Sequence, residues 1–65
     1  MPSWVRLITR HQAQPGRRIR SGAQASREWT VRCTQKVDGR VHVLFTDGTS
    51  LEIRRLIRQR WEVHP

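Results

Sequence analysis

The sequence predicts a small, mainly β domain, because its central third contains three runs in which apolar and polar residues alternate. The runs lie between Trp29 and Ile53 and are separated by two Asp-Gly pairs, Asp38-Gly39 and Asp47-Gly48. Alternation is typical of strands that are buried on one face, and Asp-Gly is a strong signal for a tight turn between antiparallel strands. We therefore expect a meander of three strands, over about 28–36, 40–45 and 49–54.

The register of this meander depends on the length of its turns, since a slip of one residue moves every side chain to the other face. A two-residue turn at Asp38-Gly39 would set Cys33 opposite Leu44 and would scatter the apolar residues over both faces. A three-residue loop, with its glycine in the left-handed region and a bulge beside it, keeps them together. The pairs expected when this loop is used at both turns are Val31–Phe45, Cys33–Val43, Val43–Leu51 and Val41–Ile53.

This register separates an apolar face from a basic face. The apolar face is expected to hold Val31, Cys33, Val41, Val43, Phe45, Leu51 and Ile53. The opposite face is expected to hold Thr30, Arg32, Thr34, Lys36, Arg40, His42, Leu44, Glu52 and Arg54, with His42 opposite Glu52. Trp29 and Trp61 have the parity of the apolar face and are expected in the core.

The elements outside the meander are less strongly marked. Residues 3–10 are rich in β-forming side chains and predict a first strand, whereas 11–26 contain Pro15-Gly16 and few apolar groups and predict a long basic loop. A short helical turn near 55–60 and a last strand at 61–64 complete the expected order. An alternative is a carboxyl-terminal helix over 50–62, because Thr49 to Glu52 match a capping box that precedes apolar residues at helical spacing.

The charge of the chain is its strongest compositional feature. Thirteen basic residues face five acidic ones among 65 residues, which gives a net charge of +8, and Lys36 is the only lysine. Such a field suggests nucleic acid, an acidic protein or an anionic membrane as partner, and arginine suits phosphates through its planar fork. The single cysteine excludes an intramolecular disulfide, and no signal peptide or membrane span is evident, so we expect a cytoplasmic protein.

The basic residues predict three groups of candidate nucleic-acid ligands. Arg17, Arg18 and Arg20 lie in the expected loop and predict a flexible clamp. On the outer strand face the candidates are Arg32, Lys36, Arg40 and Arg54. A second dense cluster near the carboxyl terminus contains Arg54, Arg55, Arg58 and Arg60. Trp4 stands beside Arg6 and has the opposite parity to its apolar neighbours, so it either stacks on a base or caps the core. No catalytic motif, metal-ligand spacing or cofactor motif is present, and we expect a non-enzymatic protein.

The central motif resembles that of a known class. Trp29-x-Val31, followed by V-D-G-R-V-H-V-L-F-T-D-G-T, is similar over residues 29–48 to the Tudor-type branch of small SH3-like barrels. The resemblance implies a partly open, five-stranded barrel. In that class, Tudor domains bind methylated side chains in an aromatic cage, whereas small basic members bind DNA. This chain has no tyrosine, which favours the basic, DNA-binding branch.

Three functional hypotheses remain open from the sequence. The leading one is a regulatory or architectural protein that binds nucleic acid, duplex DNA before RNA, with little sequence selectivity. The second is a protein-interaction module, of a phage or plasmid type, that docks on an acidic surface of a larger machine. The third is an RNA-binding accessory protein. The expected state is a monomer or a homodimer.

Overall fold

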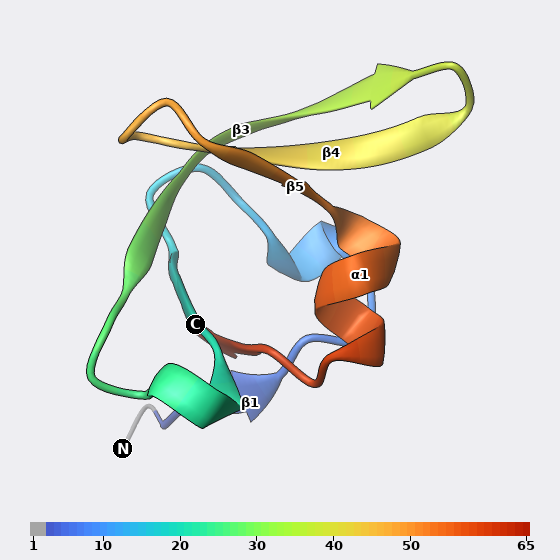
Figure 1. Cartoon of the computed structure of the whole chain (residues 1–65). Helices are drawn as coiled ribbons and strands as arrows, with labels where there is room; N and C mark the ends of the chain where they lie inside the picture. The colour runs from blue at the N-terminus through green and yellow to red at the C-terminus, as the bar shows by residue number, and fades with distance from the viewer. Residues whose placement is uncertain (1–2) are drawn as a thin grey trace.

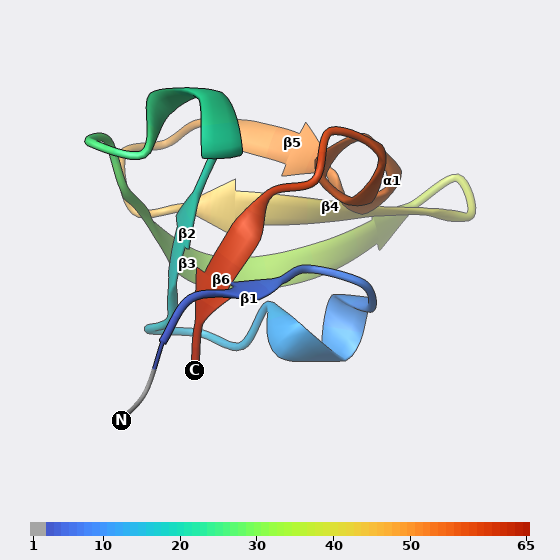
Figure 2. The same cartoon turned by 90° about the horizontal axis from the view of Figure 1, so that it is seen from below.

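The computed structural model describes residues 3–65, and these form one antiparallel sheet with a short helix (Figures 1 and 2). The six strands in this region are β1 (Val5–Arg6), β2 (Arg18–Arg20), β3 (Trp29–Val37), β4 (Arg40–Phe45), β5 (Ser50–Glu52) and β6 (Glu62–His64). The helix is α1 (Ile53–Arg58), and two 3-10 turns are η1 (Arg10–Gln12) and η2 (Gly22–Gln24). The order across the sheet is β1-β6-β2-β3-β4-β5, which confirms a small, mainly β and partly open fold.

The sheet folds over itself because β3 is shared by two differently oriented halves. Its first two residues pair with β2, and from Val31 onward it pairs with β4. A bulge at Arg32 interrupts the ladder between these halves, and bulges bend and twist the strand that contains them. In Figure 1 the β3–β4–β5 half therefore crosses the top of the molecule, while β1 lies below it.

The core fills the space between the two halves of the sheet, and α1 closes one end against β4 and β5. Its fully or nearly fully buried members are Leu7, Ala13, Ile19, Val31, Val43, Phe45, Ile53, Leu56, Trp61 and Val63. Trp29 packs against this cluster, with its ring 5.0 Å from that of Trp61 and 6.3 Å from that of Phe45. The expected core positions of Trp29 and Trp61 are thus confirmed.

The first hairpin corrects the predicted register. Asp38 and Gly39 both have positive φ, 51° and 77°, and Val37 pairs directly with Arg40, so the turn has two residues. Such a turn matches the right-handed twist of the strands that it joins, and Asp-Gly tolerates its left-handed backbone. Cys33 therefore pairs with Leu44 rather than Val43. The bulge at Arg32 then restores the expected Val31–Phe45 pair, which the two-residue turn alone would have lost.

This correction exchanges the faces of several side chains. Thr34 pairs with Val43 and Lys36 with Val41, so both lie on the inner side of the sheet and not on the predicted outer face. Cys33 moves to the outer side and is only half-buried, which makes its assignment to the apolar face wrong.

The second hairpin has the predicted three-residue loop. Val43 pairs with Leu51, His42 pairs with Glu52, and Gly48 has a φ of 89° at the left-handed position of the loop. The Asp47 carboxylate accepts hydrogen bonds from the side chain and the backbone N–H of Thr49, at 2.6 and 2.9 Å. These bonds lower the pKa of Asp47 below its ordinary value of 3.8. The predicted Val41–Ile53 pair is not formed.

That pair is missing because the chain leaves the sheet at Ile53, where α1 begins. The alternative helix over 50–62 is wrong, since Ser50–Glu52 is a strand and the helix ends at Arg58. The hydrogen bonds at the carboxyl-terminal end of α1 explain why the helix is short. The Trp61 N–H donates to the Leu56 carbonyl and the Arg60 N–H to the Ile57 carbonyl, at 3.0 and 3.1 Å. This pair of bonds is a Schellman cap.

The amino-terminal third differs most from its prediction. The expected strand over 3–10 shrinks to Val5–Arg6, because Thr9 and Gln12 form a capping box that starts η1. The expected loop over 11–26 contains β2, which pairs with β3 on one side and β6 on the other. One buried apolar residue, Ile19, anchors β2, and a single apolar side chain between arginines gives no alternation to detect.

Candidate nucleic-acid interface

Four arginines extend from the solvent-facing side of α1 and its carboxyl-terminal cap. The helix buries Ile53 and Leu56 in the core, and the spacing of 3.6 residues per turn turns the positions between them outward. The exposed arginines, which we call the α1 face, are Arg54, Arg55, Arg58 and Arg60. Two of them lie four positions apart, Arg54 and Arg58, and so share one side of the helix.

The α1 face has no internal acidic partner among residues 3–65. The ion pairs in this region are Arg18–Glu28 at 3.0 Å and Arg20–Glu62 at 2.9 Å, and neither involves α1. Arg55 and Arg58 lie in the last turn of the helix, where a positive charge offsets the helix dipole. This effect is small for so short a helix, so the positive charge remains largely available to an external anion.

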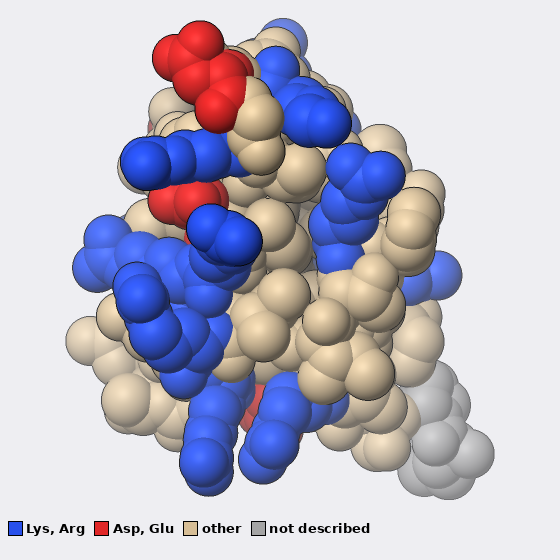
Figure 3. Space-filling model, turned by 90° about the vertical axis from the view of Figure 1, so that its right-hand side faces the viewer, with Lys and Arg blue, Asp and Glu red and all other residues tan. Residues whose placement is uncertain are grey.

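The surrounding surface extends this positive region. Figure 3 looks at the side of the molecule that holds α1 and the turn between β3 and β4, and Lys and Arg side chains dominate its charged surface. Lys36 and Arg40 are exposed near that turn. Gln59, the polar neighbour of the arginines, already accepts a hydrogen bond from the Trp61 indole at 3.2 Å. The region therefore offers charge far more than base-specific hydrogen bonding.

The predicted clamp is not a flexible arm. Arg18 and Arg20 lie on β2, which is hydrogen-bonded on both sides, and each forms one of the two ion pairs. Arg17 donates to the Gln12 carbonyl at 3.1 Å. These three residues hold the sheet and the preceding turn in place, and they are separate from the α1 face in the sequence and in their contacts.

Trp4 belongs to the same part of the sheet and is half-buried. The Arg20 guanidinium lies 4.3 Å from its ring centroid and that of Arg18 lies at 5.7 Å, while the His64 ring meets it edge-on at 5.3 Å. Cation–π contacts between residues of the same chain stabilise its fold. The ring therefore packs against side chains of β2 and β6.

The structure thus divides the predicted ligands into separate groups. Arg54, Arg55 and Arg58 come together on α1, Lys36 and Arg40 lie at the β3–β4 turn, and Arg32 is exposed at the bulge. The prediction omits Arg10, which η1 places beside the β3–β4 hairpin. The capping-box pattern Thr9-x-x-Gln12 is the sequence signal that would have marked η1.

Comparison with protein-family models, with curated proteins and with solved structures finds no match to the chain. The resemblance to SH3-like barrels of the Tudor type therefore stays a prediction. Within residues 3–65, no group of three histidine, cysteine or acidic side chains could hold a metal ion. No helix of this part of the chain has the length and apolar character needed to cross a membrane.

Proposed function

We propose that the protein binds duplex DNA, without catalysing a reaction on it, through the α1 face. The observation that carries the proposal is the set of four neighbouring exposed arginines with no carboxylate bonded to any of them in the described region. Guanidinium groups bind phosphates through paired hydrogen bonds and keep their charge at any physiological pH. The proposal also includes a regulatory or architectural role, in the cytoplasm.

Binding of this kind is dominated by release of counterions from the phosphates. Each phosphate neutralised contributes about −0.9 to the slope of log K against log salt concentration. Four arginines on the α1 face therefore predict a slope of about −3.6. Little sequence selectivity is expected, because phosphate contacts fix position without reading bases.

A matched pair of double variants tests the proposal by fluorescence anisotropy with a duplex of about 20 base pairs. Arg54→Gln with Arg58→Gln removes two charges from the α1 face. Arg27→Gln with Arg32→Gln removes two charges from positions outside it. The first variant should lower the magnitude of the slope by about 1.8 and weaken binding about 60-fold at 0.1 M salt. The second should leave the slope close to that of the unmodified protein.

Equal losses in the two variants would mean that only net charge matters and would overturn the assignment to the α1 face. No anisotropy change with any duplex at low salt would overturn DNA binding altogether. An RNA hairpin of equal length, added as competitor, separates the two nucleic acids. If the RNA displaces the labelled DNA at a tenth of the concentration that unlabelled DNA needs, the protein binds RNA more tightly by about 1.4 kcal/mol. The ligand would then be RNA.

A further inference from the structure

The outer edge of β3 is open along its second half. Hydrogen bonds on the β2 side of β3 end at Val31, whose N–H donates to the Arg17 carbonyl and whose carbonyl accepts from the Gly16 N–H, both at 2.8 Å. Beyond Val31 the chain of residues 13–15 turns away, while β3 continues to Val37 with β4 as its partner. The position in the sheet that a longer β2 would occupy is therefore vacant.

Two residues present their backbone groups to this vacant position. Val37 and Arg40 close a two-residue turn, so they form a hydrogen-bonded pair, and pairs along the ladder then alternate. Lys36 and Thr34 occupy the alternate positions, where N–H and carbonyl groups point away from β4. No hydrogen bond from another described residue reaches either backbone. This edge is longer than those of β1 and β5, which have two and three residues.

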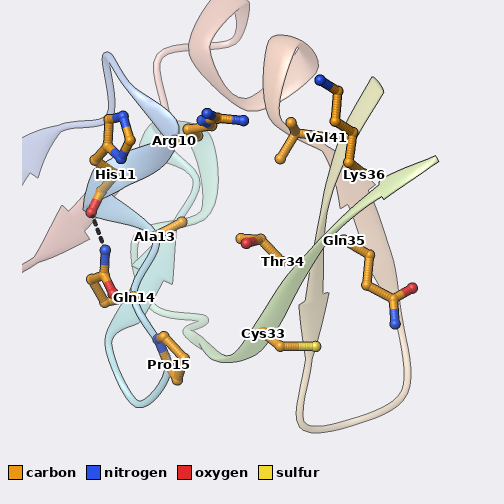
Figure 4. Close-up of a pocket in the computed structure, with 10 residues that line it drawn as sticks. All are labelled: Arg10, His11, Ala13, Gln14, Pro15, Cys33, Thr34, Gln35, Lys36 and Val41. Atoms are coloured by element: carbon orange, nitrogen blue, oxygen red, sulfur yellow. Dashed lines mark hydrogen bonds between the residues drawn. The ribbon is translucent and has the colours of Figure 1, made fainter. Parts of the chain in front are cut away.

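A groove runs beside the open edge and carries positive charge. It has a volume of about 510 Å³ and lies between the η1 segment and the inner side of the β3–β4 hairpin (Figure 4). Figure 4 shows Thr34 turned toward the η1 wall, and Cys33 and Gln35 turned away from it. Arg10 and Lys36 line the groove from opposite walls, and none of the described residues that line it is acidic.

We propose that an extended acidic peptide segment of a partner protein binds this groove as an added strand on β3. The four backbone groups of Thr34 and Lys36 supply the ladder, and Arg10 and Lys36 receive the acidic side chains. An exposed edge with unpaired N–H and carbonyl groups is a template for such strand addition. The charge of the two walls selects for the acidic composition.

The same features disfavour a second copy of this chain as the occupant. An inward-pointing charged residue and a bulge are the devices by which sheets block unwanted pairing, and β3 has both, in Lys36 and at Arg32. Pairing of two β3 edges would bring two Lys36 side chains into one groove between proteins of charge +8. An acidic strand removes that obstacle because its carboxylates neutralise Lys36 and Arg10.

The test uses capped peptides with the alternating sequence (Glu-Val)₄ and NMR of the ¹⁵N-labelled protein. Two derivatives carry N-methyl groups, one on every Val and one on every Glu, and so remove the N–H groups of one edge or the other. One derivative should bind about tenfold more weakly than the parent peptide, and the other should bind like it, because only one edge of the added strand faces β3. The Thr34 and Lys36 amides should exchange with solvent about tenfold more slowly when the peptide is bound.

Charge-reversed variants separate this groove from the α1 face. Arg10→Glu with Lys36→Glu should weaken peptide binding at least about tenfold, and Arg54→Glu with Arg58→Glu should change it less than about threefold. Equal sensitivity to both derivatives, or shifts confined to α1, would show that the peptide binds by charge alone and would overturn the proposal. Concentration-dependent dimerisation through Thr34 and Lys36 without peptide would assign the edge to a second copy instead.

Discussion

Substitution of Arg60 by glycine should raise the stability of the protein and weaken its binding to DNA. Arg60 is the C′ residue of the Schellman cap of α1 and has a φ of 60°, in the left-handed region that glycine usually occupies at this position. The left-handed backbone costs a residue with a Cβ about 1–2 kcal/mol. Against this gain, glycine has more conformational freedom than arginine in the unfolded chain, which favours unfolding by about 0.4–1 kcal/mol. The net stabilisation is therefore about 0.5–1 kcal/mol, or an increase in Tm of about 4 °C for a domain of this size.

The same change removes one of the four charges of the α1 face. Loss of a single phosphate contact lowers affinity about eightfold at 0.1 M salt and reduces the magnitude of the salt slope by about 0.9. Arg60→Ala is the matched control, because it removes the charge but keeps a Cβ in the left-handed region. We expect both variants to lose the same affinity, and only the glycine variant to gain stability in thermal unfolding followed by circular dichroism.

Two results would refute this reasoning. A glycine variant no more stable than the alanine variant would show that the backbone at Arg60 is not strained. Unchanged DNA binding in both variants would remove Arg60 from the interface. A gain in stability together with a loss in affinity would instead show that the arginine is retained at a conformational cost, as strained residues at functional sites are.

Two further predictions concern the hairpins. The lowered pKa of Asp47 means that its contribution to stability is present above its ordinary value of 3.8 and is lost as the pH falls through the lowered folded value. Asp47→Asn should therefore lose less stability than the unmodified protein as the pH falls from above 3.8 through the lowered pKa of Asp47, and a Tm-versus-pH curve of equal steepness would contradict this. Gly39→Ala should cost about 0.5–1 kcal/mol, because the penalty for a Cβ at a φ of 77° exceeds the entropy that alanine loses in the unfolded chain, and the added Cβ would meet no atom within 4 Å. Gly22→Ala is its control, because its φ lies outside the left-handed region and its Cβ would make an ordinary contact at 3.9 Å from the Arg60 carbonyl. This variant should gain about 0.4–1 kcal/mol in urea unfolding.

The meander could be predicted from the sequence because its signals are local. Alternation and Asp-Gly pairs fix the existence of β3, β4 and β5, and the second turn and the Val43–Leu51 pair agree with the structure. The first turn could not be resolved by counting apolar residues. A two-residue turn and a bulge at Arg32 together give the same Val31–Phe45 pair as a three-residue loop with no bulge at Arg32. The two solutions differ only beyond the bulge, where Thr34 and Lys36 change faces.

The candidate site could be predicted only in part from the sequence, for a similar reason. The arginines of α1 are close together in the sequence, so their clustering needs no knowledge of the fold. Arg18 and Arg20 also look like a cluster, yet their roles depend on Glu28 and Glu62, and the second of these is 42 positions away from Arg20. Contacts over such separations arise from the pairing of β2 with β6. This pairing could not be predicted from the sequence, because Ile19 is the one apolar residue in β2. Arg10 joins the groove through the same kind of long-range packing.

The two proposed surfaces use different chemistry, and this difference decides how their ligands are told apart. The α1 face offers side-chain charge, which any polyanion can satisfy, so DNA binding there depends on salt and little on the shape of the ligand. The β3 edge offers backbone donors and acceptors at a fixed spacing, which only another extended polypeptide can match along its length. A protein of charge +8 will attract acidic peptides to both surfaces. Affinity alone therefore cannot identify the occupant of the groove, whereas the asymmetric response to N-methylation can, because phosphates and side-chain carboxylates have no N–H to lose.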